Sequence, residues 1–273
     1  MVYKPLSLTE KIKEYINEFL VIFRDSRTLK DRIVILMGYS KTPIYLLNYL
    51  RSTPNKKPLI SDVTIKNNYG TFFCGRDLYS VLYFSSSFES EVRKELYEMR
   101  GGVVIDVGAN GGMHSIPLAK LNKKVIAIEP EPKNFEILKK NIFLNHLKNI
   151  TPLRVACSDK DGKSYLYLDD ESAGGHTIIL ENTARKKRKA EIETVKLDTI
   201  IKRFKIDRVS LIKVDVEGAE SLVLKGAIKT IKKDHPKIVF EAWNEEHLDK
   251  VKKILEPLSY KIGKIARDNY LAS

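Results

Sequence analysis

The stretch that decides the fold is VVIDVGANGG at residues 103–112, followed further along by IEP at residues 128–130. It predicts a buried strand, a glycine-rich turn, a helix and a second strand that ends on the carboxylate of Glu129. Glycine accepts positive φ angles and lets a ligand approach the backbone, as a tight turn at Gly108 requires. Glu129 lies 21 residues after Gly108, where an acidic side chain can bind both hydroxyls of a ribose. The stretch therefore predicts a site for an adenosine-containing cofactor.

Strands and helices alternate on both sides of this turn, which is typical of a doubly wound α/β sheet. Buried strands are expected at residues 103–107, 125–128, 153–157, 210–214 and 237–240, and the C-terminal tail supplies one or two more. Residues 163–197 interrupt the alternation and are interpreted as a β-hairpin-like insertion. We therefore expect a main domain at residues 61–273, most of it a mostly parallel sheet.

The N-terminal part differs in pattern. Apolar residues recur at helical spacing over residues 8–24, a second helical stretch runs over residues 29–50, and residues 52–58 form a Pro-containing linker. A β-hairpin with an Asn/Gly turn is expected at residues 63–74. Residues 1–60 are thus interpreted as a helical extension that caps the main domain.

Composition describes a globular protein: 43% of the 273 residues are hydrophobic and 30% are charged. No apolar run approaches the length of about 18 residues that a transmembrane helix needs, and no signal-peptide pattern is present. Cys74 and Cys157 lie in apolar, strand-like surroundings without metal-ligand spacing, which predicts buried thiols in a reducing compartment. A cytoplasmic protein is expected.

The net charge of +13 comes largely from lysines scattered along helix faces, which favours a solvated surface. The chain also has no glutamine and is rich in Ile, Lys and Glu, a bias of heat-adapted proteins. The exception is RKKRK at residues 185–189, a concentrated basic patch that would suit an anionic partner.

Ligands of open α/β sheets bind at the carboxyl ends of the strands, so the residues found there are candidates for the site. These residues are Asp106, Gly108, Asn110, Gly111, Gly112, Glu129, Ser158, Asp159, Asp215, Glu217 and Glu241. We expect Ser158 or Asp159 to contact the adenine, with an ordinary turn at residues 158–162 as the alternative.

The glycine turn differs from the dinucleotide fingerprint G-x-G-x-x-G, because Asn110 stands where the second glycine belongs. Asp106 also lies two residues before the first glycine. A pyrophosphate needs bare N–H groups and no nearby carboxylate, whereas the ammonium and sulfonium groups of S-adenosylmethionine are cations. The turn therefore favours S-adenosylmethionine over a dinucleotide.

Several segments together resemble the FkbM-type S-adenosylmethionine-dependent methyltransferases. They are DVGAN at 106–110, IEP at 128–130, KVDVEGAE at 213–220 and VLKGA at 223–227, supported by FE at 88–89, LD at 197–198 and FE at 240–241. The resemblance covers roughly residues 62–245. It implies a Rossmann-like class I methyltransferase fold with a seven-stranded sheet, and commonly methylation of a hydroxyl on a sugar or secondary metabolite. A small-molecule or glycan acceptor is expected.

The chain departs from the family pattern in two places. His114-Ser115 follows the glycine turn where an aromatic residue is common, and residues 169–190 form a basic insertion. Both segments lie where acceptor recognition can differ within the family. The resemblance therefore defines the acceptor class less closely than it defines the cofactor.

Methyl transfer to an alcohol needs positioning and removal of the acceptor proton. Asp215 and Glu217 are expected at the acceptor end of the cleft, as a base or, with Glu241, as ligands of a hard cation. The alternative is that Glu217 caps the following helix or pairs with a lysine. His114 and His176 are rival bases because imidazole titrates near neutrality.

The sequence leaves two other functions open. An RNA methyltransferase would use the basic insertion, but DVEG at 215–218 replaces the Asn/Asp-Pro-Pro-aromatic motif of base methylation, and the basic run lacks interleaved aromatic residues. A non-catalytic adenosine-binding protein is the second. The sequence leaves the acceptor, the metal requirement and the oligomeric state open.

Overall fold

The computed structural model describes residues 8–40, 62–75, 78–168, 175–179 and 188–273. The chain divides into two compact units, Met1–Ser90 and Glu91–Ser273. The first unit includes the hairpin that sequence reasoning assigned to the main domain, and each unit is described by itself.

The first unit contains three helices and one hairpin among its described residues: α1 (Leu8–Asp25), α2 (Leu29–Ser40), β1 (Thr64–Lys66), β2 (Thr71–Phe73) and α4 (Leu78–Phe84). The predicted first helix and the antiparallel hairpin are confirmed. Asn67 shapes the hairpin turn, because its Oδ1 accepts hydrogen bonds from the backbone N–H groups of Tyr69 and Gly70. The end of the predicted second helix and the linker lie outside the described residues.

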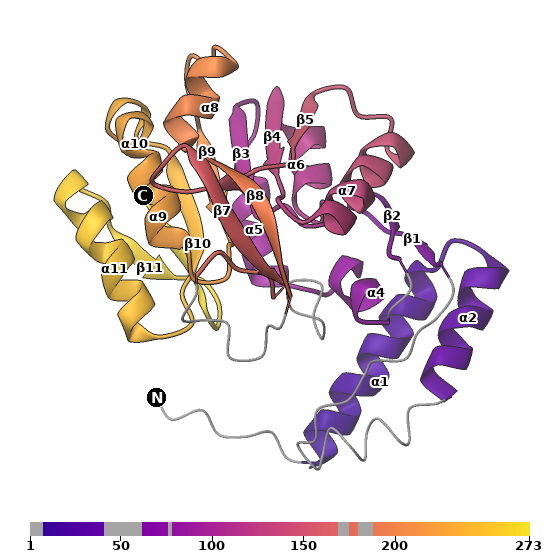
Figure 1. The fold of residues 1–273 in the computed structure, drawn as a ribbon. Helices are drawn as coiled ribbons and strands as arrows, with labels where there is room; N and C mark the ends of the chain where they lie inside the picture. The colour runs from indigo at the N-terminus through magenta and orange to yellow at the C-terminus, as the bar shows by residue number, and fades with distance from the viewer. Residues whose placement is uncertain (1–7, 41–61, 76–77, 169–174, 180–187) are drawn as a thin grey trace. The chain divides into compact units, whose positions relative to one another are not determined.

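The second unit is built on a seven-stranded sheet with the order β11-β12-β10-β9-β3-β4-β5 (Figure 1). Five of its strands are parallel, and β12 runs antiparallel to both of its neighbours. The strands are β3 (Val103–Val107), β4 (Lys124–Ile128), β5 (Ile150–Leu153), β9 (Leu211–Val214), β10 (Lys237–Glu241), β11 (Ile262–Lys264) and β12 (Asn269–Ala272). The predicted mostly parallel, seven-stranded sheet is confirmed.

Helices cover both faces of this sheet, as alternation of side chains along the strands requires. Ile105 and Val107 pack into a core with α8 (Leu197–Arg203), α9 (Glu220–Gly226), α10 (Ile228–Asp234) and α11 (Glu245–Leu255). Val104 packs into the core of the other face, with α5 (Ser90–Glu98), α6 (Ser115–Leu121) and α7 (Pro132–Leu144). The sheet is therefore doubly wound, as predicted.

Strand order reverses between β3 and β9. The chain continues from β3 to β4 and β5 on one side, and from β9 to β10 on the other. Such a reversal leaves a crevice outside the carboxyl ends of the two strands, where ligands of this class of sheet bind. The topology therefore places the site between the ends of β3 and β9.

The predicted strand at residues 153–157 is wrong as a single element. β5 ends at Leu153, and β6 (Ala156–Cys157) joins a separate three-stranded sheet of order β6-β8-β7. Pro152 lacks a backbone N–H, so β5 is suited to the edge of the main sheet. β7 (Gly162–Leu168) and β8 (Arg188–Val195) form the antiparallel pair of the insertion.

Cys74 and Cys157 are buried and form no disulfide, as expected. Burial raises the pKa of the Cys157 thiol to about 12, which makes it unreactive. Within the described part of the chain, no helix combines the length and the apolar character needed to cross a membrane.

Candidate functional site

The glycine turn after β3 lies directly against the turn after β9. Gly108 has a φ of +80°, and a Cβ atom built on it would lie 1.7 Å from the carbonyl oxygen of Asp215. Only glycine fits this approach and this backbone angle. Asn110 also has a positive φ of 49°, and its Oδ1 accepts a hydrogen bond from the N–H of Gly111 at 2.7 Å. Gly112 has a φ of +93°, and a Cβ atom built on it would lie 2.8 Å from Cδ1 at the end of the Leu138 side chain.

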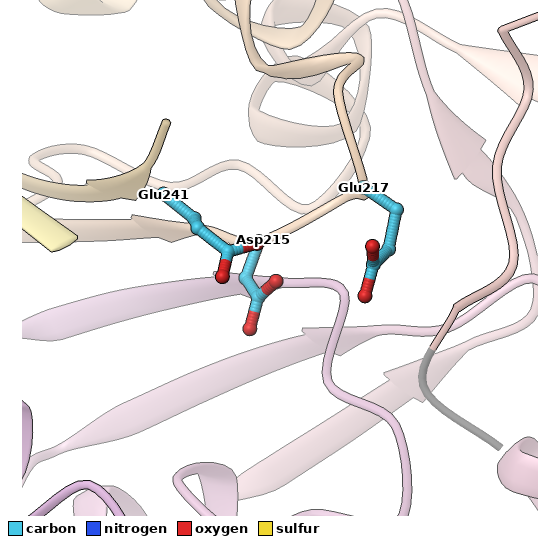
Figure 2. A group of neighbouring side chains, drawn as sticks. All are labelled: Asp215, Glu217 and Glu241. Carbon is cyan, nitrogen blue, oxygen red and sulfur yellow. The ribbon is translucent and has the colours of Figure 1, made fainter. Parts of the chain in front are cut away.

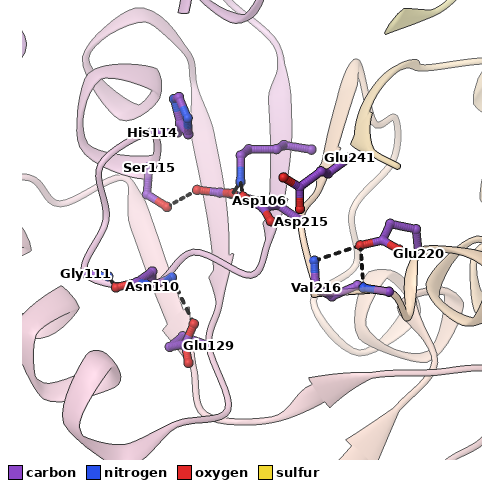
Figure 3. Close-up of polar contacts among 12 residues, drawn as sticks. Asp106, Asn110, Gly111, His114, Ser115, Glu129, Asp215, Val216, Glu220 and Glu241 are labelled. Carbon is purple, nitrogen blue, oxygen red and sulfur yellow. Dashed lines mark hydrogen bonds and ion pairs between the residues drawn. The ribbon is translucent and has the colours of Figure 1, made fainter. Parts of the chain in front are cut away.

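Glu129 stands at the end of β4, beside this turn. Its Oε2 accepts a hydrogen bond from the N–H of Asn110 at 2.9 Å (Figure 3). Its Oε1 accepts one from the backbone N–H of Glu131 at 2.8 Å. A carboxylate offers about four acceptor positions, so each oxygen keeps capacity for a ribose hydroxyl. Burial raises the pKa of the Glu129 carboxyl to about 7, against the opposing effect of the two backbone N–H groups.

Asp106 lies behind the turn and is completely buried. Its Oδ2 accepts a hydrogen bond from the hydroxyl of Ser115, and its Oδ1 lies 3.7 Å from Nζ of Lys213 (Figure 3). Asp106 and Lys213 are register partners on the adjacent strands β3 and β9. These contacts give Asp106 a supporting position, and its direct contact with a cofactor stays a prediction.

Lys213 is a buried cation that sequence reasoning missed. It is only 3% exposed, and its Nζ donates a hydrogen bond to Oδ2 of Asp215 at 3.1 Å. A buried charge requires opposite charges around it, and here they come from Asp106 and Asp215. The signal in the sequence was a lysine inside the apolar strand LIKV at 211–214.

Three carboxylates gather at the ends of β9 and β10, as the strand-end argument predicted. One oxygen from each of Asp215, Glu217 and Glu241 lies within 4.8 Å of the others (Figure 2). Burial, followed by the charges of Asp215 and Glu217, raises the pKa of Glu241 to about 9. The raised pKa of Glu241 favours its protonated form, which reduces the repulsion within the group. We call Asp215, Glu217 and Glu241 the acidic cluster.

Glu220 shapes the turn that carries two members of the acidic cluster. Its Oε1 accepts hydrogen bonds from the N–H groups of Val216 at 3.2 Å and Gly218 at 3.1 Å. Glu217 has a positive φ of 57° within this turn. The residue before α9 is Ala219, with no side-chain cap, and the carboxylate of Glu220 bonds the turn instead. Burial raises the pKa of Glu220 to about 7.

The two candidate histidines occupy different places. His114 is buried, and its Nδ1 lies 3.4 Å from the hydroxyl of Tyr97, which suits packing better than proton transfer to an acceptor. His176 is partly buried and precedes Thr177, whose hydroxyl donates a hydrogen bond to the carbonyl oxygen of Glu217 at 2.8 Å. The structure thus ties the segment of His176 to the acidic cluster through Thr177, and the role of either histidine as a base stays a prediction.

Ser158 and Asp159 follow β6, in the smaller sheet. Ser158 is buried, and its hydroxyl donates a hydrogen bond to Oδ1 of Asp159 at 3.3 Å. Residues 159–161 form bends, as the alternative of an ordinary turn at residues 158–162 requires. Contact of either side chain with an adenine stays a prediction.

The basic insertion is described only in part. Residues 185–187 of the RKKRK run lie outside the described residues, and Arg188 and Lys189 begin β8. Nζ of Lys189 lies 4.1 Å from the ring centroid of Tyr165. A cation over an aromatic face is a stable arrangement within one hairpin, so this contact needs no external partner.

Residues 106–262 match the sequence profile of the Methyltransferase FkbM domain. The match spans more than half of the chain, from the aspartate before the glycine turn to the first residue of β11. The chain belongs to the FkbM methyltransferase family, and the fold described above is its α/β architecture.

Three curated relatives show different parts of the similarity. Methyltransferase sdnD of Sordaria araneosa is 28% identical over 51% of this chain and 66% of its own length. Hexuronic acid methyltransferase AglP of Haloferax volcanii is 29% identical over 61% of this chain and 67% of its own length. A tRNA(Phe) (4-demethylwyosine(37)-C(7)) aminocarboxypropyltransferase of Methanocaldococcus jannaschii is 34% identical over 37% of this chain and 42% of its own length. The chain spans about two thirds or less of these relatives.

Proposed function

We propose that this protein is an S-adenosylmethionine-dependent methyltransferase that methylates a hydroxyl of a sugar or another small metabolite. The observation that carries the proposal is the contact between Gly108 and the backbone of Asp215. This contact places the glycine turn, which suits the cofactor, next to the carboxylates, which suit an acceptor hydroxyl. Membership of the FkbM methyltransferase family supports the same reaction.

The cofactor would lie over the glycine turn. Glu129 would bind the ribose hydroxyls, because its two oxygens are held in place by backbone N–H groups and keep free acceptor capacity. Gly108, Asn110, Gly111 and Gly112 would form the surface below the cofactor, and Asp106 would support that surface from behind. Ser158 or Asp159 would contact the adenine.

Acceptor activation would fall to the acidic cluster. As the acceptor oxygen bonds to the methyl carbon and the sulfur–carbon bond of the cofactor breaks, the hydroxyl proton passes to a carboxylate. Asp215 and Glu217 are the candidates, because the raised pKa of Glu241 favours its protonated form. His176 is the rival base, since Thr177 bonds its segment to Glu217.

The acidic cluster could instead hold a divalent cation that polarises the acceptor hydroxyl. Carboxylate oxygens are the ligands that hard cations prefer, and one oxygen of each cluster member lies within 4.8 Å of the others. Turnover that falls after chelation and returns with Mg²⁺ or Mn²⁺ would favour this arrangement, whereas turnover unaffected by chelation favours direct proton transfer.

The proposal is tested by transfer of a labelled methyl group to separate pools of oligosaccharides, small hydroxylated metabolites and tRNA. Label in an alkali-stable ether of a saccharide or metabolite is the expected result. Binding of the cofactor without transfer to any pool would contradict methyltransferase activity and favour an adenosine-binding role.

RNA modification is the second candidate, because one relative acts on tRNA and the described end of the insertion is basic. Transfer to the tRNA pool, with an RNA affinity that falls steeply as salt rises, would favour it.

A further inference from the structure

Trp243 stands beside the acidic cluster and has no place in the proposed reaction so far. It is the single tryptophan of the chain and follows Glu241, the last residue of β10, by two positions. It is 37% exposed, although tryptophan is an apolar residue that folding usually covers. An accessible indole at the edge of a polar site is therefore a candidate contact for a ligand.

Two neighbours hold this indole in one orientation. Its Nε1–H donates a hydrogen bond to Oε2 of Glu241 at 2.7 Å, and its ring centroid lies 5.4 Å from that of His247. His247 belongs to the first turn of α11, where the side chain of Asn244 accepts a hydrogen bond from its backbone N–H at 2.9 Å. A ring fixed in this way loses little rotational freedom when a ligand binds.

The pair of an aromatic face and a row of carboxylates matches the two kinds of surface on a sugar. A pyranose ring presents axial C–H groups on its face, and the electron-rich face of an indole attracts their partial positive charge. The rim of the same ring carries hydroxyl donors, which carboxylates accept. Since Glu241 belongs to the cluster and bonds to Trp243, one sugar ring can meet both surfaces.

We propose that Trp243 is the platform on which the acceptor stacks, and that the acceptor is a neutral sugar ring whose hydroxyls face Asp215, Glu217 and Glu241. The proposal rests on the proposed function, because it names the acceptor class of the same site. The negative charge of the cluster disfavours a uronic acid, whose carboxylate would meet like charges. Trp243 thus selects for a ring with an apolar face, and the cluster selects against an anionic one.

The test uses the full-length protein with saturating S-adenosylhomocysteine and three probes: methyl β-glucopyranoside, methyl α-mannopyranoside and glucuronic acid. Saturation-transfer NMR measures which ligand protons contact the protein, and tryptophan-selective fluorescence reports on Trp243 alone. We expect a saturable fluorescence change with at least one neutral glycoside, and the strongest saturation transfer on the C–H protons of one ring face. Glucuronic acid should bind at least several-fold more weakly.

Matched variants separate stacking from folding. Trp243→Ala should weaken glycoside binding by roughly three- to tenfold, the value of one aromatic contact, whereas Trp243→Phe should retain most of it. Phe143→Ala removes another exposed aromatic residue, on α7, and should leave binding unchanged. Cofactor affinity, measured by calorimetry, should be the same in all three variants.

Two results would overturn the inference while leaving the proposed function intact: normal cofactor binding with unchanged glycoside affinity in Trp243→Ala, or glucuronic acid bound as tightly as the neutral glycosides. The absence of binding by every neutral probe would also overturn it. If the wild-type protein does not bind the cofactor, the proposed function itself is contradicted. Failure of the inference and failure of the proposed function are therefore distinguishable.

Discussion

Nζ of Lys213 lies 3.1 Å from Oδ2 of Asp215, in a position where the lysine is almost entirely buried. The same nitrogen is 3.7 Å from Asp106, so one cation serves the carboxylate before the glycine turn and the carboxylate after β9. This arrangement ties the cofactor side of the site to the acceptor side through a single side chain.

Replacing Lys213 by methionine should destabilise the protein strongly, because it leaves the buried carboxylate of Asp106 without its cation. Removing one partner of a buried ion pair costs about 3–5 kcal/mol, to be measured by urea unfolding. Lys163→Met is the control, since Lys163 forms an exposed ion pair with Glu191, worth at most about 1 kcal/mol. Equal losses in the two variants would show that Lys213 has no special role.

Gly108→Ala should impair both folding and cofactor binding, because its Cβ would overlap the carbonyl oxygen of Asp215. Gly101→Ala is a matched control: Gly101 also has a positive φ, of 73°, but no atom lies within 4 Å of a built Cβ. The backbone angle alone costs about 1–2 kcal/mol. The additional loss of unfolding free energy in Gly108→Ala, relative to Gly101→Ala, therefore measures the steric conflict. Similar unfolding free energies for the two variants would be incompatible with the close approach.

Cofactor affinity should rise with pH between about 6 and 8, because the pKa of Glu129 is raised to about 7 and its ionised form is the better acceptor for ribose hydroxyls. The contribution of Glu129 to folding stability changes with pH in the opposite direction to the cofactor affinity. A carboxyl pKa raised from 4.5 to about 7 on folding contributes stability that is fully present below pH 4.5 and is lost as pH rises through 7.

Calorimetric titrations of the wild type and Glu129→Gln across this pH range check the prediction. The variant should bind more weakly and without the pH dependence, whereas Glu136→Gln, on the exposed side of α7, should behave as the wild type. A Glu129→Gln variant with the same rise in affinity would place the titrating group elsewhere.

Asp215→Asn should lower turnover by about a hundredfold or more, the usual contribution of a general base, while cofactor binding stays measurable. Methyl transfer and calorimetry on the same preparation separate the two effects. Asp249→Asn, at an exposed position of α11, should retain full turnover. Near-normal turnover in Asp215→Asn would show that Asp215 is not the base and would favour Glu217 or His176.

Local patterns were enough to predict the core of the fold. Strand β3, the glycine turn and Glu129 follow each other within one βαβ unit, so apolar runs and turn residues define them. Strand β6 could not be predicted in this way, because Ala156 pairs with Thr194, a residue far along the chain. The position of a strand within one sheet or another depends on such distant partners.

In the candidate site, too, some features could be predicted from the sequence and others could not. The approach of Asp215, Glu217 and Glu241 follows from the rule that the carboxyl ends of parallel strands share one edge. The ion pairs of Lys213 and the hydrogen bonds of Glu220 could not be predicted from this rule. Charged side chains have several partners in reach, and only three-dimensional packing selects among them. The hydrogen bond from Trp243 to Glu241 also depends on three-dimensional packing and could not be predicted from the sequence.

The most direct test of the central claim is a calorimetric titration of the protein with S-adenosylmethionine, repeated in the presence of excess NAD. We expect saturable one-to-one binding of S-adenosylmethionine that NAD does not displace, and weaker binding in Glu129→Gln. Binding of NAD in preference to S-adenosylmethionine, or no binding of S-adenosylmethionine at all, would contradict it.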